Sequence, residues 1–193
     1  MDVVRDRCRD PPADDHRGGA HGTPARHQRR LKEPAHVCEH CGCRGVEPIA
    51  KLMDEHFEML DLSGDIRHCL VSGDHRRAAR LLDVLGDRLA PHARREERGI
   101  FAALREKDEF VEELRGLEEE HAAFDEILAG LDPGTTDFPG RVLALLDDLS
   151  LHIDRENLGI FPIAVVTLGA SGWDLVAEAG EEGAVGVSQA HRG

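Results

Sequence analysis

Apolar residues recur at intervals of three or four positions along four long segments of the chain, as in "LLDVLGDRL" and "VLALLDDLSLHI". This spacing is typical of amphipathic α-helices that bury one face. None of the segments alternates apolar and polar residues with the period of two that predicts a strand. The pattern therefore predicts an all-α protein with helices over residues 46–73, 74–105, 108–132 and 136–169.

Residues that favour helix ends support these bounds. Pro48 suits the first turn of the first helix, and Asp74 is a candidate N-cap of the second. Gly86 or Pro91 is expected to bend the second helix, and Pro162 to distort the fourth. The short connections favour antiparallel neighbours, so the predicted fold is an up-down-up-down four-helix bundle.

The bundle is expected to occupy residues 46–178, with "SGWDLVAEAG" adding one or two turns that bring Trp173 over one end. Residues 1–35 are rich in Arg, Asp, Pro, Gly and His and are predicted to form a disordered arm. Residues 36–45 form a Cys/His cluster, and residues 179–193 are expected to be a flexible tail.

Composition and charge narrow the classes of partner. No stretch approaches the roughly 18–20 apolar residues that cross a membrane, and the N-terminus lacks the apolar core of a signal peptide. We therefore expect a cytoplasmic protein without membrane contact. A formal net charge of -14 argues against binding nucleic acid. The 12 histidines stand out, because histidine is the commonest metal ligand among side chains.

The chain contains one unusual phrase twice. "HARREERGIF" begins at His92 and "HIDRENLGIF" begins at His152, and both fit H-x-x-R-E-x-x-G-I-F. Residues four apart lie on one face of a helix. His92 with Glu96, and His152 with Glu156, are therefore each expected to present an imidazole and a carboxylate to the same point.

The first and third predicted helices carry a shorter shared phrase, in which Glu-His is followed shortly by an apolar residue and aspartate. It places His56 in the first and His121 in the third. An antiparallel bundle would bring one histidine from each helix and two carboxylates together, a geometry that builds two-metal sites. Four histidines, two bridging carboxylates and a bridging oxide or hydroxide leave roughly two of twelve positions open on two six-coordinate ions. Mixed imidazole and carboxylate ligands with open positions suit iron.

The order H…HxxxE…H…HxxxE over residues 47–169 resembles the hemerythrin-like family, also called the HHE cation-binding domain. The resemblance implies a non-heme site with two Fe ions and dioxygen or a related small oxidant as the ligand. The implied terminal ligands are His56, His92, His121 and His152. The implied bridging carboxylates are Glu96 and Glu156.

Two departures separate this chain from the oxygen-carrying members. Carriers have a second histidine on the third helix, where this chain has Leu117, and their last carboxylate lies one residue farther from its histidine than Glu156 does. Glu118, Asp125 or solvent is expected to fill the position that Leu117 leaves. Both departures point away from simple oxygen storage.

Three further pairs recur in the phrase: Arg95 and Arg155, Gly99 and Gly159, and Phe101 and Phe161. The arginines are either outer partners of the carboxylates or exposed helix charges. The glycines indicate a close approach of backbones between helices, because glycine is unfavourable inside a helix. The phenylalanines are expected to form an apolar wall around the site.

The cysteine cluster has three open interpretations. Cys38, Cys41 and Cys43, with His36 or His40, have the ligand types of a zinc site. A redox-active CxxC pair is the second interpretation, and a knot that docks on the bundle without metal is the third. Residues 36–45 are also expected to offer a contact for a protein partner or redox donor.

Three functions follow from these features. The leading one is a module that binds or senses dioxygen, nitric oxide or iron. The alternative is a di-iron oxidase, oxygenase or peroxide-disproportionating enzyme that uses the same site. The third is an interaction protein in which the iron site only controls folding.

Overall fold

The computed structural model describes residues 42–185, and side-chain surroundings through Gly180. These residues belong to one compact unit, and they form helices and connecting turns without any strand. No helix in this part of the chain has the length and apolarity to cross a membrane. The elements, in chain order, are η1 (Cys43–Gly45), α1 (Glu47–Val71), α2 (His75–Glu96), η2 (Glu97–Phe101), α3 (Ala102–Arg105), α4 (Val111–Ala129), α5 (Phe138–Arg155), η3 (Glu156–Ile160), α6 (Phe161–Thr167) and α7 (Ala170–Val185).

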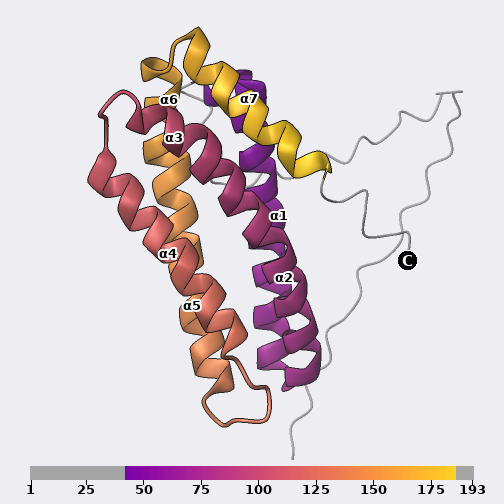
Figure 1. The fold of residues 1–193 in the computed structure, drawn as a ribbon. Helices are drawn as coiled ribbons and strands as arrows, with labels where there is room; N and C mark the ends of the chain where they lie inside the picture. Colours follow the sequence, from indigo (N-terminus) through magenta and orange to yellow (C-terminus); the bar gives the residue numbers. More distant parts are fainter. Residues whose placement is uncertain (1–41, 186–193) are drawn as a thin grey trace, which may run out of the picture. The chain divides into compact units, whose positions relative to one another are not determined.

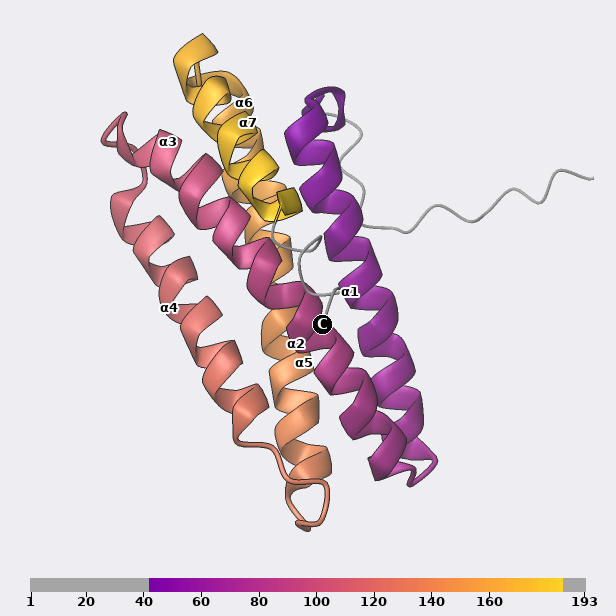
Figure 2. The ribbon, with the colours of Figure 1, turned by 45° about the vertical axis from the view of Figure 1, so that its right-hand side comes forward.

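The four long helices lie side by side as a bundle (Figure 1). α1 packs against α2 and α5, and α4 packs against the same two helices. Tight connections reverse the chain between α1 and α2 and between α4 and α5, so each pair forms a helical hairpin (Figure 2). α2, η2 and α3 continue one another, as do α5, η3 and α6, which places each repeated phrase in the second arm of a hairpin.

Local chemistry in the first hairpin explains why its two helices begin where the sequence predicts. Pro48 lies in the first turn of α1, where its missing N–H costs no hydrogen bond. The Asp74 carboxylate accepts a hydrogen bond from the backbone N–H of Arg77 at 3.0 Å and caps α2. Gly73 ends α1 in the left-handed region, with φ at 75°.

The bend expected at Gly86 or Pro91 stays a prediction, and the change of helix type lies farther along. α2 continues as a regular α-helix across both residues and changes geometry only at η2, which is a π-helical segment. The second phrase does the same at η3, directly before Pro162. Since η2 has no neighbouring proline, proline is not the shared cause. η2 begins one residue after Glu96 and η3 begins at Glu156, and π-helical segments are frequent at functional sites.

α7 is longer than the one or two turns that the sequence predicts, and it continues past residue 178 to Val185. It packs along η2 and α3 and buries Val176 and Ala179, which lie three residues apart on one face. Trp173 is half-buried against the core at this end of the bundle, as expected.

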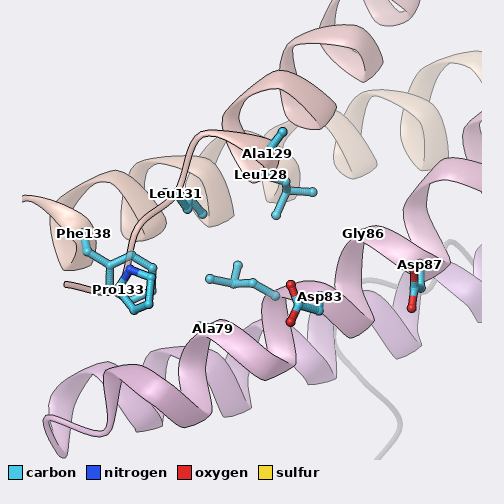
Figure 3. Close-up of a pocket in the computed structure, with 10 residues that line it drawn as sticks. Ala79, Asp83, Gly86, Asp87, Leu128, Ala129, Leu131, Pro133 and Phe138 are labelled. Carbon is cyan, nitrogen blue, oxygen red and sulfur yellow. The ribbon is translucent and has the colours of Figure 1, made fainter. Parts of the chain in front are cut away.

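The apolar core consists of two clusters. The Phe101 cluster includes Leu52, Leu117, Phe101 and Phe161, and the Phe138 cluster holds residues from the opposite ends of the same long helices. A cavity of about 280 Å³ opens between α2 and the α4–α5 connection, lined by Leu82, Leu128 and Phe138 among others (Figure 3). Apart from Ser63, the buried polar residues of the described part of the chain lie between the two clusters along the helices.

Candidate metal centre

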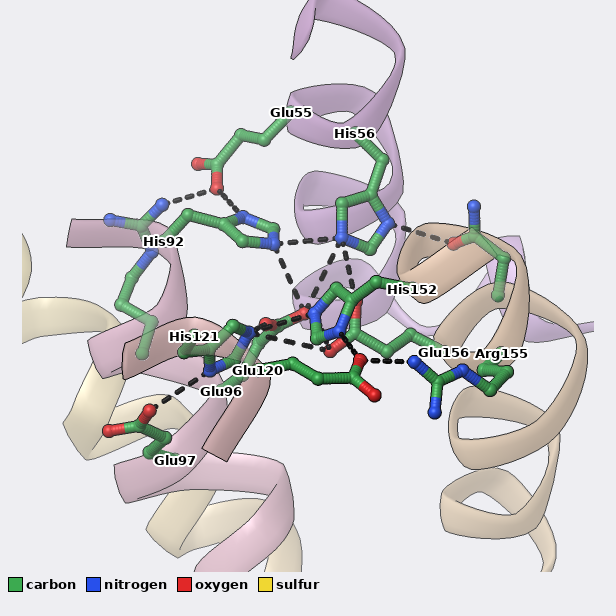
Figure 4. Close-up of polar contacts among 12 residues, drawn as sticks. Glu55, His56, His92, Glu96, Glu97, Glu120, His121, His152, Arg155 and Glu156 are labelled. Atoms are coloured by element: carbon green, nitrogen blue, oxygen red, sulfur yellow. Dashed lines mark hydrogen bonds and ion pairs between the residues drawn. The ribbon is translucent and has the colours of Figure 1, made fainter. Parts of the chain in front are cut away.

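Four histidines, one from each long helix, meet in the middle of the bundle. His56 comes from α1, His92 from α2, His121 from α4 and His152 from α5, and each is at most 5% exposed (Figure 4). Each histidine falls at a core position of its helix, which is why the amphipathic pattern turns it inward. The structure thus brings together the four histidines that the sequence predicts.

The histidines approach each other in two pairs. Nε2 of His92 lies 2.8 Å from Nε2 of His56, and Nε2 of His152 lies 2.9 Å from Nε2 of His121. Each pair joins the two helices of one hairpin. The two pairs face the same central space, which the two phrase glutamates enter from α2 and η3 (Figure 4).

Each glutamate directs one oxygen toward each histidine pair. For Glu96, Oε1 lies 3.1 Å from His92 Nε2, and Oε2 lies 3.6 Å from His121 Nε2. For Glu156, Oε1 lies 3.2 Å from His152 Nε2, and Oε2 lies 3.2 Å from His56 Nε2. This is the disposition of two bridging carboxylates.

The opposite ring nitrogen of every histidine has an acceptor. In three histidines Nδ1 donates to a carboxylate at 2.8–2.9 Å: His92 to Glu55, His121 to Glu97 and His152 to Glu120. In His56, Nδ1 donates to the amide oxygen of Asn157 at 3.0 Å. These bonds fix the tautomer that leaves a lone pair on Nε2. Sequence reasoning missed these four acceptors, although each follows a repeated rule. Two precede the histidines of the shorter phrase, and two follow the phrase glutamates.

The phrase arginines contact outer carboxylates. Arg95 donates to Glu55 and Arg155 donates to Glu120, so neither touches the central glutamates. Of the two interpretations left open by the sequence, Arg95 fits the outer-partner one, with 17% of its side chain exposed. Arg155 likewise donates to an outer carboxylate, although 52% of its side chain is exposed.

The charges in the cluster shift the pKa of its members in opposite directions. Burial disfavours a charged imidazole, yet the negative charges of Glu96, Glu55 and Glu156 outweigh it and raise the pKa of His92 to about 10. The pKa of His152 is raised by the same kind of balance. The pKa of Glu156 lies well below its ordinary value, because His152 and His56 outweigh the effect of burial.

Aromatic rings cover the outer faces of the histidines. Phe161 stacks on His56 with centroids 5.7 Å apart, and Phe101 stacks on His121 at 6.1 Å. Both phenylalanines are fully buried, so the predicted apolar wall is present. The predicted packing of the phrase glycines holds only at Gly99, which faces α7, because no other segment lies within 4 Å of a Cβ built on Gly159.

The structure does not bring the additional expected ligands to the cluster. Glu118 pairs with Arg105 near the surface, and Asp125 is exposed on α4. Leu117 fills its own position as part of the Phe101 cluster. An amphipathic helix places these carboxylates off its buried face, which explains the difference.

Of the cysteine cluster, the structure describes Cys43 alone, and this residue is buried and disulfide-bonded. The other proposed members lie outside the described residues, so zinc or redox chemistry there stays a prediction. These members are His36, Cys38, His40 and Cys41.

The central residues fit a bound cation. All four oxygens of Glu96 and Glu156 are buried without accepting a hydrogen bond, a costly arrangement that a cation relieves. The paired Nε2 lone pairs repel one another unless a proton or metal lies between them. The ligand atoms within each of two groups lie within 4.8 Å of one another, and these groups are His56, His92, Glu96 and Glu156, and His121, His152 and Glu156.

The fold and this cluster define a helical bundle protein with a buried His/Glu cation site. A family model described as "Hemerythrin HHE cation binding domain" matches residues 47–164, which is more than half of the chain. The chain therefore belongs to the hemerythrin HHE cation-binding family. Neither a search of curated proteins nor a search of solved structures found a match.

Proposed function

We propose that this protein holds two iron ions between its hairpins and uses them to bind or sense dioxygen, nitric oxide or iron. The observation that carries the proposal is that Glu96 and Glu156 each direct one oxygen toward each histidine pair. One pair of nitrogens and one oxygen from each glutamate would hold each ion. Imidazole and carboxylate ligands together suit iron.

The surroundings of the site support a small ligand. Histidine and glutamate side chains in the cluster are at most 5% exposed, and Phe161 and Phe101 stack on His56 and His121. Bound iron would supply positions for a diatomic ligand and a change of oxidation state. The chain's part is to exclude bulk water, to hold each imidazole by its Nδ1 hydrogen bond, and to admit molecules that are small enough to pass between helices.

The alternative is an enzyme that activates oxygen or disproportionates peroxide at the same site. It is supported by Leu117, a buried apolar residue where oxygen carriers have another histidine. Leu52 lies four residues before His56 just as Leu117 lies four residues before His121, so both halves lack a further ligand at this position. Fewer protein ligands leave more positions for an oxidant.

Iron content tests the proposal directly. The purified chain is expected to hold about two irons, and the double variant His92→Ala/His152→Ala is expected to hold less than one. The matched control is His68→Ala/His75→Ala, which removes two histidines outside the cluster. A wild-type chain without iron, or a double variant that retains two irons, would contradict the assignment.

Anaerobic reduction followed by oxygen titration separates the two functions. A binding or sensing module is expected to give a spectrum that reverses when oxygen is removed. An enzyme would instead oxidise irreversibly and turn over an organic substrate or peroxide. Nitric oxide added to the reduced protein tests the second candidate ligand in the same way.

A further inference from the structure

The two phrases differ at the residue that follows the bridging glutamate. Glu97 follows Glu96, whereas Asn157 follows Glu156. Both side chains have the same task, which is to accept the Nδ1 hydrogen bond of a histidine on the other hairpin. Three of the four histidines therefore donate to a carboxylate, and His56 donates to a neutral amide.

This difference falls on one of the two proposed metal positions. The His56 position comprises His56 and His92, and the His121 position comprises His121 and His152, each with one oxygen from each glutamate. The two positions also differ in that Glu96 lies closer to His92 Nε2, at 3.1 Å, than to His121 Nε2, at 3.6 Å, and in that Phe124 meets His152 edge-on. The remaining contacts correspond. Each has one histidine backed by a Glu–Arg pair and one histidine stacked on a phenylalanine.

A charged acceptor and a neutral one affect a ligand imidazole differently. A carboxylate draws the Nδ1 proton toward itself and makes Nε2 a stronger donor to a metal, and the loss of such a partner typically costs about 10–100-fold in metal affinity. Asn157 is 1% exposed, and its amide Nδ2 has no hydrogen-bond partner. Leaving a buried donor unpaired is unfavourable, so packing alone does not account for this residue.

We propose that Asn157 makes the His56 position the weaker and more exchangeable of the two, while Glu97 makes the His121 position the tighter. This inference rests on the proposed binding of two ions. It implies that the ions load in order, and that a form with one ion exists over a range of iron concentrations. A position that fills and empties in this way is suited to reporting iron supply.

The test measures stepwise metal binding by the full-length, metal-free chain. Co²⁺ is titrated first because its visible absorption reports each ion separately, and Fe²⁺ is then titrated anaerobically against a chelator. We expect two steps that differ by about 10–100-fold in affinity. Repulsion between the two ions would separate the binding steps even at identical positions. Variants are therefore needed to show that Asn157 and Glu97 cause the difference in affinity.

One substitution adds a negative charge beside the His56 position, and another removes one beside the His121 position. Asn157→Asp is expected to strengthen the weaker step by about tenfold or more, and Glu97→Gln to weaken the tighter step by a similar factor. A residue with only a structural role would not improve binding when replaced. Asp125→Asn is the matched control for Glu97→Gln, because it also removes one negative charge but lies exposed on α4 and outside the cluster.

Each outcome discriminates. If Asn157→Asp and Glu97→Gln leave both steps unchanged while two ions still bind, this inference is overturned and the two-iron proposal survives. If the wild-type chain binds one ion or none, the two-iron proposal itself fails. Melting of each metal-free variant shows whether it folds. If Asn157→Asp does not fold, Glu97→Gln provides the test, because Glu97 is partly exposed and its replacement disturbs the core less.

Discussion

The two π-helical segments carry the same phrase but have different neighbours. η2 lies under α7, and a Cβ on Gly99 would come within 3.4 Å of Val176 and Ala179. On η3, nothing lies within 4 Å of the same position at Gly159. α7 thus covers the end of one hairpin and not the other.

This comparison distinguishes the side-chain contacts that the shared centre requires from those that differ between the two hairpins. Histidine, glutamate and phenylalanine of the phrase make equivalent contacts in both halves, because both halves face one shared centre. The arginines also make the same contact, each with an outer glutamate, and differ only in exposure. The glycines alone differ in their neighbours, so repetition in sequence does not by itself indicate a shared packing role.

The largest expected effect tests the equivalence of the inward residues. Glu96→Gln and Glu156→Gln should each remove both ions, because each carboxylate directs an oxygen to both positions. The loss should exceed the roughly 10–100-fold that an outer partner is worth. Metal analysis after dialysis measures it. If one variant keeps two ions, the halves are not equivalent at the centre.

The pH dependence should have the same sign in both halves. In the metal-free chain the pKa of His92 is raised to about 10, and that of His152 is also raised, so metal must displace their protons. We expect loading at pH 7–8 to release the His92 proton and to weaken as pH falls, with His152 contributing in the same direction. A pH indicator in dilute buffer follows the release, and pH-independent affinity would contradict it.

The stability of the metal-free chain should change with pH in the opposite direction. Because the folded pKa of His92 exceeds its unfolded value of about 6.5, its contribution is complete below pH 6.5 and is lost as pH rises toward 10. Urea unfolding at several pH values measures this trend. A metal-free chain that gains stability between pH 7 and 10 would refute the assigned charge state.

A smaller effect tests the cover that α7 provides. Gly99→Leu should cost about 1–3 kcal/mol of unfolding free energy, because its side chain meets the backbone of Val176. At Gly159 an added Cβ meets no neighbour, so Gly159→Leu should cost less than Gly99→Leu, and replacing a glycine inside a helix offsets part of any loss. Urea denaturation of both variants compares them, and equal losses would show that the two segments are packed alike.

The smallest effect concerns the arginines. Arg155→Ala removes a half-exposed ion pair and should cost at most about 1 kcal/mol. Arg95→Ala should cost more, because its pair with Glu55 is less exposed. Thermal melts of the two variants give the difference. A larger loss for Arg155→Ala would reverse the comparison.

The sequence was sufficient to predict the helices and the six central side chains. Spacing of three and four residues determines which side chains share a buried face, and His92 with Glu96 needs only this rule. The cap at Asp74 followed from local chemistry in the same way. These features depend on contacts within one helix or on one repeated order, both of which are visible in a single chain.

Other features depend on how helices cross, which spacing does not determine. Glu55 reaches His92 from a neighbouring helix, and Asn157 reaches His56 across the bundle. In both phrases the H-x-x-x-E spacing is that of an ordinary α-helix, so no local sequence signal predicts the π-helical segments. The length of α7 was missed because its Gly-containing sequence is a weak helix former, and its packing on η2 compensates.

The polar layer between the Phe101 and Phe138 clusters has a further consequence. Every long helix crosses it, so each end of the bundle has its own apolar core and the middle depends on charge. We expect amide hydrogen exchange in the metal-free chain to show two sets of slowly exchanging helix turns, which bound ions merge into one. Resistance to proteolysis would then follow iron supply, and the lifetime of the chain would itself depend on the metal.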